Sequence, residues 1–305
     1  MCLIAVLAWG GMFPIMEPAL RILDPFYFTL LRYGSVAVIF AGLLLVIEGP
    51  KAFKPEKHGI KLWLLGTAAF AGFSFLVFLG QKLAGPSGSV IASVMMAIQP
   101  LLGVIVAWVW HRVKPPIFSL VAMVVAAIGV FMVVTKGNIG SLLRGSNTLI
   151  AAGLILLGAL CWVIYTAGGA DFSKWSILRY SALTTIYGMI SVVVIIALAT
   201  SVGWLRLPTI HQIQGVSGAL VYMVVLAGVV AVFAWNFGNR IVGSINGILF
   251  MNLVPVTSFI ISVLGGYHIS SFELIGCLLT IVALIVNNLC NRRKAEAKNY
   301  LEEEG

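Results

Sequence analysis

The chain has 305 residues, of which 61% are hydrophobic and 10% are charged, and its mean hydropathy is +1.07. A soluble domain carries about 25% charged residues, because it covers its surface with polar side chains. This composition excludes a soluble enzyme, a secreted disulfide scaffold and a disordered chain. The formal net charge of +9 lies in short gaps between apolar segments, so it indicates membrane topology and not nucleic-acid binding.

Long apolar segments recur along the whole chain. A helix needs roughly 20 mostly apolar residues to cross the hydrocarbon core of a bilayer. The sequence therefore predicts an all-α, polytopic membrane protein, and we expect no cleaved signal peptide because the first segment lacks a basic start. The ten predicted transmembrane helices are residues 1–20, 28–47, 62–83, 87–110, 117–135, 148–168, 178–201, 217–239, 243–265 and 271–290.

The basic residues orient these segments. With a cytoplasmic N-terminus, 13 of the 19 Lys and Arg residues lie in cytoplasmic connections or the C-terminal tail, and 6 lie on the other side. Cytoplasmic loops carry the excess of basic residues in membrane proteins. We therefore expect a multi-pass protein of the cell inner (plasma) membrane with both termini in the cytoplasm. In this assignment Arg32 belongs to the outer side.

Short similarities relate the two halves of the chain. Leu31-Arg32-Tyr33 recurs as Leu178-Arg179-Tyr180, and Gly88-Ser89-Val90 recurs as Gly243-Ser244-Ile245. Each half holds five segments, and since five is odd the halves must enter the membrane from opposite sides. Inverted repeats of this kind are typical of secondary transporters, with the substrate site at their interface. The predicted parts are a first five-helix repeat (1–135), a linker (136–147), a second five-helix repeat (148–290) and a basic cytoplasmic tail (291–305) that ends in a remnant of added sequence.

Polar and aromatic side chains gather deep within several segments. A polar group left unsatisfied in hydrocarbon costs several kcal/mol, so such side chains are expected to face a cavity or a neighbouring helix. The alternatives are interfacial belts for Trp and Tyr, ordinary packing for Met95 and Met96, and helix-joining hydrogen bonds for Asn246 and Asn252. The predicted substrate-binding residues of a central cavity are Trp9, Met12, Phe13, Met95, Met96, Gln99, Trp162, Tyr165, Trp235, Asn236, Asn239 and Asn252.

Three further residues have predicted roles in the transport cycle. Pro100 and Pro255 occupy corresponding positions of the fourth and ninth segments and are expected to act as paired hinges. Glu17 is the one acid near the membrane interior and is a possible coupling site. The alternative for Glu17 is an ion pair with Arg21, four residues later.

The sequence gives no sign of catalytic chemistry. Its four cysteines lie in or beside apolar segments without a C-x-x-C pair, and they are predicted to be packing residues. No Ser-His-Asp set, metal-ligand spacing or phosphate-binding loop occurs within the segments. We therefore expect no enzymatic activity, no cofactor and no metal.

The segment pattern resembles a known family. The ten segments in two halves, Trp9-Gly10, Arg32, Arg179 and the matched prolines resemble the EamA family of the drug/metabolite transporter superfamily, and within it the YddG-type amino-acid exporters. The resemblance implies a basket-like bundle whose cavity is lined mainly by segments one, three, four, six, eight and nine. Many members carry Gly-Glu after segments four and nine, where this chain has Trp110-His111-Arg112 and Gly266-Tyr267-His268, so that acid's role is not carried over.

The candidate cavity residues are aromatic, sulfur-containing or amide-bearing, without net charge. Such a lining favours a neutral or zwitterionic solute. Our hypothesis is a secondary transporter that exports such metabolites, with aromatic or hydrophobic amino acids as substrates, by alternating access. The expected partners are the small-molecule substrate and the lipid bilayer, with no nucleic acid, and a monomer is expected. The alternatives are a proton-coupled drug or cation antiporter using Glu17, an intramembrane lipid-modifying enzyme and a structural scaffold.

Overall fold

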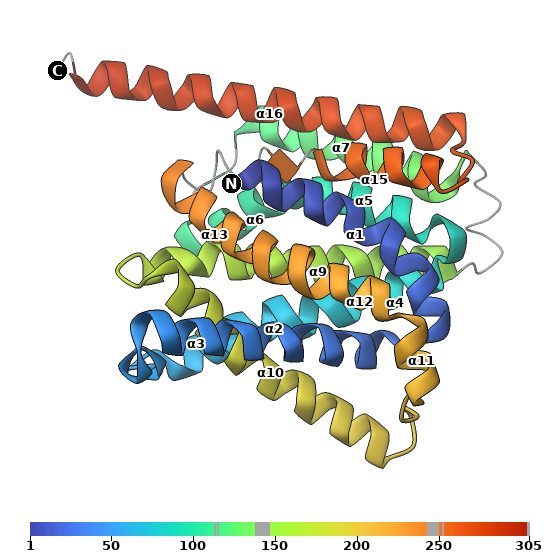
Figure 1. Cartoon of the computed structure of the whole chain (residues 1–305). Helices are drawn as coiled ribbons and strands as arrows, with labels where there is room; N and C mark the ends of the chain where they lie inside the picture. Colours follow the sequence, from blue (N-terminus) through green and yellow to red (C-terminus); the bar gives the residue numbers. More distant parts are fainter. Residues whose placement is uncertain (113, 115, 138–146, 243–249, 252, 304–305) are drawn as a thin grey trace.

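The computed structural model describes the chain except residues 113, 115, 138–146, 243–249, 252 and 304–305, and for His111 and residues 291–303 it describes the backbone alone. Within these limits every regular element is a helix (Figure 1). Eight helical segments are long and apolar enough to cross a membrane. They comprise α1 (Cys2–Ile22), α2 (Pro25–Glu48), α3 (Gly59–Gly66) with α4 (Phe73–Leu83), α7 (Ile117–Thr135), α9 (Asn147–Gly168), α10 (Ile177–Ser201), α12 (Ser217–Val224) with α13 (Ala231–Val242), and the first part of α16 (Ser271–Glu303).

The fourth predicted segment is broken. It consists of α5 (Gly88–Ala97) and α6 (Gln99–His111), which are bent by 45° at the break and together form a ninth candidate span. For the ninth predicted segment, the described part is the shorter helix α15 (Leu253–Leu264). The count of ten crossings therefore stays a prediction. The remaining short helices are η1 (Pro50–Phe53), η3 (Gly85–Ser87), η4 (Gly169–Phe172) and α11 (Ile210–Gly215).

The second segment begins earlier than predicted. Asp24 accepts a hydrogen bond from the backbone N–H of Phe26, and Pro25 is the first helical residue, so α2 starts at Pro25 instead of residue 28. Arg32 consequently lies two turns inside a membrane-spanning helix. Its assignment to the outer side of the membrane stays a prediction, but its side chain is buried within the bundle.

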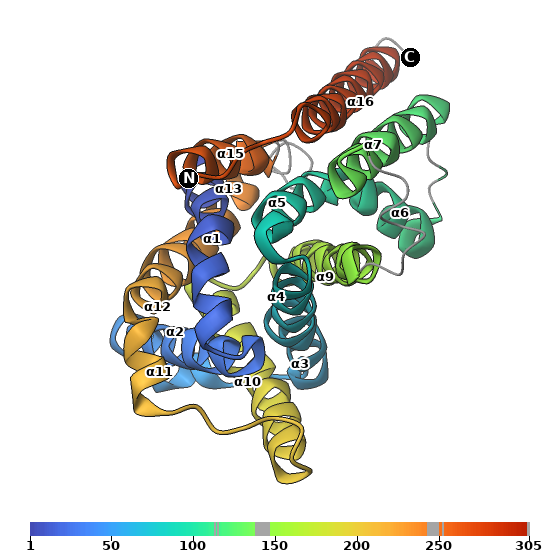
Figure 2. The same cartoon turned by 90° about the vertical axis from the view of Figure 1, so that its right-hand side faces the viewer.

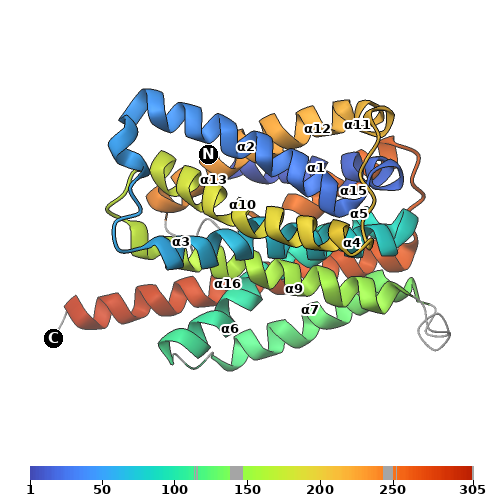
Figure 3. The ribbon, with the colours of Figure 1, turned by 90° about the horizontal axis from the view of Figure 1, so that it is seen from below.

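The helices run side by side as one bundle (Figures 1 and 3). Viewed along the helix axes, α7 and α16 lie next to each other on one side of the bundle, and α2 and α10 lie towards the opposite side (Figure 2). Glycines bring α7 and α16 into close contact, since a Cβ atom on Gly129 would lie 2.5 Å from the carbonyl oxygen of Gly276. Large apolar side chains are exposed along α2, α7, α10 and α16, as a surface in contact with lipid requires.

Two π-helical stretches occupy corresponding places in the two halves. Thr67–Gly72 lies between α3 and α4, and Val225–Val230 lies between α12 and α13. Each follows an α-helix of 8 residues. A π-helical turn leaves backbone carbonyls available for other partners and is frequent at functional sites. The paired stretches support an internal repeat, and the opposite orientation of its halves stays a prediction.

Candidate functional site

A cavity opens among helices from both halves of the chain. Its walls leave space for about one or two water molecules, so a larger solute enters only when the helices separate. Six of the twelve predicted site residues line it: Trp9, Met12, Phe13, Met96, Gln99 and Trp162. Five further residues of the wall were not predicted from the sequence: Arg32, Tyr33, Phe73, Met251 and Val254.

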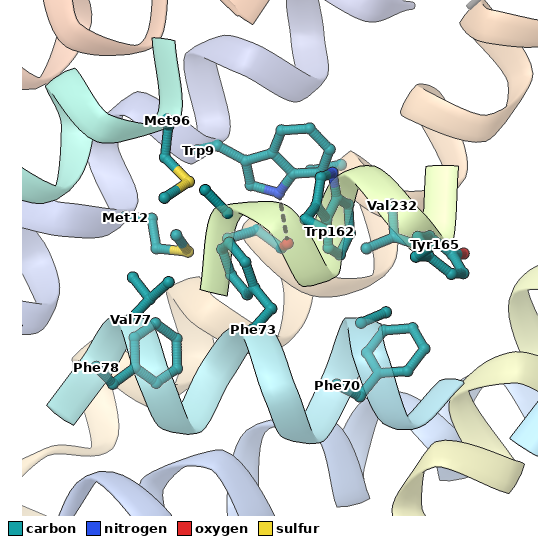
Figure 4. Packing of buried hydrophobic residues seen from close by; sticks show 14 of the residues in the cluster. Trp9, Met12, Phe70, Phe73, Val77, Phe78, Met96, Trp162, Tyr165 and Val232 are labelled. Carbon is teal, nitrogen blue, oxygen red and sulfur yellow. Dashed lines mark hydrogen bonds between the residues drawn. The ribbon is translucent and has the colours of Figure 1, made fainter. Parts of the chain in front are cut away.

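Aromatic rings form one wall of this cavity (Figure 4). The ring of Trp9 lies 5.4 Å from that of Trp162, which lies 5.3 Å from that of Phe73. Trp9 donates a hydrogen bond of 3.0 Å from Nε1 to the carbonyl of Ala227, in the second π-helical stretch. Trp9 and Trp162 are 7% and 4% exposed, so they belong to the interior of the bundle and not to an interfacial belt.

Arg32 brings a positive charge to the cavity wall, whereas the lining residues predicted from the sequence carry no charge. Its side chain is fully buried and its guanidinium lies 4.4 Å from the centre of the Tyr33 ring. Nε donates to the carbonyl of Met223 and Nη2 to that of Ala227, both over 3.2 Å. Nη1 has no hydrogen-bond partner in the described part of the chain. The neutral-cavity expectation is therefore wrong, because the second segment takes the place expected for the eighth.

The two predicted asparagines of the eighth segment do not line the cavity. Asn236 donates from Nδ2 to Tyr165 over 3.2 Å and to the hydroxyl of Ser181 over 2.8 Å. Tyr165 also stacks on Tyr180 at 5.5 Å between ring centres. Asn239 donates to a carbonyl of its own helix. Asn236 therefore joins α13 to α9 and α10, whereas the bond of Asn239 is local to α13.

The other predicted cavity residues have different positions. Trp235 packs against Trp9 at 5.3 Å between ring centres and is not part of the cavity wall. Met95 is buried within α5, likewise off the wall. Asn252 lies outside the described residues. Hydropathy alone could not separate Met95 from Met96, because both are neighbouring apolar residues of a buried helix.

Gln99 and the two prolines mark the ends of helices. The amide Nε2 of Gln99 lies 3.2 Å from the sulfur of Met96, across the 45° bend. Pro100 is the second residue of α6, so the predicted break of this span is present at the expected place. Pro255 lies in the first turn of α15. The hinge roles of both prolines stay predictions.

Glu17 lies outside the cavity, near one end of the bundle. Arg21 donates to its carboxylate from Nη2 over 2.9 Å, and the hydroxyl of Ser89 lies 3.5 Å from its other oxygen. The carboxylate is therefore held as the ion-pair alternative predicted.

A second polar cluster ties the end of α7 to the start of α16. Lys136 donates from Nζ to Tyr267 over 2.9 Å and lies 3.3 Å from the carboxylate of Glu273. Glu273 is fully buried and accepts from Tyr267 over 2.7 Å and from the backbone N–H of Ser270 over 2.8 Å. Burial lowers the pKa of Lys136, but its contacts with Tyr267 and Glu273 outweigh burial and leave that pKa raised. Burial and the hydrogen bond to Glu273 raise the pKa of Tyr267.

Membrane-spanning helices with an apolar exterior enclose a cavity that carries aromatic rings and one cation. These features define a multi-pass membrane protein with an internal cavity. The chain belongs to the EamA-like transporter family, whose model matches residues 1–135 and 149–289. The predicted membership of this family is confirmed.

Relatives with transporter names match most of the chain. It is 40% identical over 303 residues to the uncharacterized transporter YrdR of Bacillus subtilis (strain 168), covering 99% of this chain and 94% of that protein. It is 28% identical to the uncharacterized inner membrane transporter YicL of Salmonella typhimurium (strain LT2), covering 86% of each. A protein of known crystal structure superposes with a TM-score of 0.65 at 17% identity, over 96% of this chain and 98% of that one. This last likeness concerns the fold alone.

Proposed function

We propose that this protein is a secondary transporter that exports aromatic or hydrophobic amino acids across the cell inner (plasma) membrane by alternating access. The observation that carries the proposal is the cavity, whose aromatic and methionine walls come from both halves of the chain. Flat rings bind apolar and aromatic side chains, and methionine adapts to varied shapes. The family and the named relatives support transport in general.

Alternating access requires the walls of the narrow cavity to move apart. We infer that α5 and α6 move about their 45° break near Pro100, and that α15 moves near Pro255. The protein works as a monomer in this proposal, with both termini in the cytoplasm. It needs no bound cofactor or metal.

Counterflow in proteoliposomes tests the proposal directly. Vesicles are loaded with unlabelled phenylalanine and diluted into labelled phenylalanine. We expect transient accumulation of the label above protein-free vesicles, because a carrier exchanges solute across the membrane. A scaffold or a lipid-modifying enzyme gives no accumulation.

Removal of a cavity ring should slow this exchange. We expect Trp162→Ala to reduce the initial counterflow rate about tenfold, since a buried aromatic contact contributes about 0.5–1.5 kcal/mol beyond the area it buries. Trp204→Ala is the matched control, because Trp204 is 84% exposed and lies between helices. Wild-type rates in the Trp162→Ala protein, inserted to the same level, would contradict the cavity assignment.

The proton-coupled alternative depends on Glu17. In our proposal Glu17→Gln keeps the wild-type dependence of counterflow on pH, because the carboxylate only pairs with Arg21 near the membrane surface. The same assay at several pH values decides this. A flattened pH profile in the variant would favour the antiporter.

A further inference from the structure

We propose that Arg32 binds the carboxylate of the transported solute, so that the cavity selects zwitterionic amino acids and small organic acids over amines. This inference rests on the proposed function, because it names the chemical group that the same cavity recognises. Three features of the described residues carry it. They are an uncompensated charge, unpaired donors and a contrast between the two halves.

Arg32 is a buried charge without a counter-ion among the residues that the structure describes. It is 1% exposed and lies within a membrane-spanning helix. Its contacts are two backbone carbonyls and the rings of Tyr33 and Phe78, none of which carries negative charge. No Asp or Glu in the described part of the chain forms an ion pair with it. A charge inside a membrane without a counter-ion is costly and typically marks a substrate pathway.

Among the described residues that line the cavity, the buried polar atoms without a hydrogen-bond partner are all donors. They are Nη1 of Arg32 and Nε1 of Trp162, both buried and both on residues that line the cavity. A ligand that satisfies them must accept hydrogen bonds. A carboxylate supplies two acceptor oxygens and the one negative charge that balances one guanidinium.

The guanidinium is held in position before any ligand arrives. Its Nε donates to the carbonyl of Met223, just before the second π-helical stretch, and its Nη2 donates to the carbonyl of Ala227, within that stretch. Nη1 is the nitrogen left for a ligand. Because two of its nitrogens are already fixed to the eighth segment, little side-chain entropy remains to be lost on binding.

The repeat counterpart of Arg32 has a carboxylate partner. Arg179 donates from Nε to the carbonyl of Ala52 over 3.0 Å and from Nη2 to the carbonyl of Lys54 over 2.7 Å. Its Nη2 also pairs with the carboxylate of Glu56 at 2.8 Å. A structural role accounts for Arg179. The same role does not account for Arg32, which has no carboxylate within the described residues.

The first test compares ligands on the wild-type protein. Purified protein is titrated with 3-phenylpropionate, phenylalanine, phenethylamine and phenyl phosphate, with quenching of tryptophan fluorescence as the measurement. We expect 3-phenylpropionate and phenylalanine to bind about 10- to 100-fold more tightly than phenethylamine, because a charged hydrogen-bonded pair contributes this much. Tighter binding of phenyl phosphate, which carries nearly two charges, would overturn the assignment to a carboxylate.

The second test changes the protein. Arg32→Gln should abolish the preference for 3-phenylpropionate over phenethylamine, and Arg32→Lys should keep part of it because the charge remains. Arg179→Gln is the matched control and should leave the ratio of the two affinities unchanged. If Arg32→Gln fails to fold, the wild-type ligand series alone decides the proposal. Equal affinity of wild type for phenethylamine and 3-phenylpropionate, or failure of both carboxylates to bind, would overturn it.

The outcomes separate this inference from the proposed function. Carboxylate-selective binding without any counterflow of phenylalanine would support the role of Arg32 and contradict amino-acid transport. Counterflow that Arg32→Gln leaves unchanged, with no preference for a carboxylate, would contradict the role of Arg32 and leave transport standing.

Discussion

Gly66→Ala is expected to lower the unfolding temperature of the detergent-solubilised protein by about 5 °C or more, or to prevent its accumulation in the membrane. Gly66 ends α3 where it meets α10. A Cβ atom there would lie 2.1 Å from the carbonyl oxygen of Thr184 and 2.7 Å from the backbone nitrogen of Gly188. Both neighbours are backbone atoms, so the two helices must separate to admit a methyl group.

Separation of these helices would also break side-chain contacts. Thr67 and Ser191 share a hydrogen bond of 2.6 Å across the same interface, and Trp63 donates to Ser191 over 2.9 Å. Gly42→Ala is the matched control, because a Cβ atom on Gly42, also in a membrane-spanning helix, has no neighbour within 4 Å. Its unfolding temperature should equal or slightly exceed that of the wild type. Equal unfolding temperatures for Gly66→Ala and Gly42→Ala would contradict the close packing of α3 on α10.

Lys136→Met is expected to destabilise the protein by about 1.5–3 kcal/mol, because it leaves the buried carboxylate of Glu273 without its cation. Glu273 keeps its hydrogen bonds from Tyr267 and Ser270, so the loss is that of one charged partner. The contacts of Lys136 raise its pKa in the folded protein above its value in the unfolded chain. The stabilisation by the Lys136–Glu273 pair is therefore complete at a pH below the pKa of the unfolded chain, and it is lost as the pH rises through the pKa of the folded protein. The effect should therefore be constant from about pH 6 to about pH 9.

A double-mutant cycle measures this pair. Lys136→Met with Glu273→Leu should cost less than the sum of the two single changes, because the double variant buries no unpaired charge. Thermal unfolding of the four proteins in one detergent gives the coupling energy. Additive effects would show that Lys136 and Glu273 do not interact in the folded protein.

Much of the fold was predictable from the sequence. The length and spacing of apolar segments predicted a helical membrane protein, and the resemblance led to the family that the comparisons confirmed. Deep aromatic residues in the first and sixth segments predicted Trp9 and Trp162 on the cavity wall. Arg32 was missed because it lies near the start of the predicted second segment and was counted with the cations of the outer side, although the N-cap signal Asp24-Pro25 places it two turns inside α2.

The direction in which each helix faces was decided by tertiary structure. A helix that is apolar on all sides carries no periodic signal for its inward face. That face is fixed by contacts between residues far apart in sequence, such as Gly66 with Gly188 and Trp9 with the carbonyl of Ala227. That this chain crosses a membrane many times follows from its amino-acid sequence alone, because the length and apolarity of a segment are local properties. Only the packed bundle decided that Arg32 faces the cavity and Asn236 a neighbouring helix, because helix rotation depends on close packing and long-range hydrogen bonds.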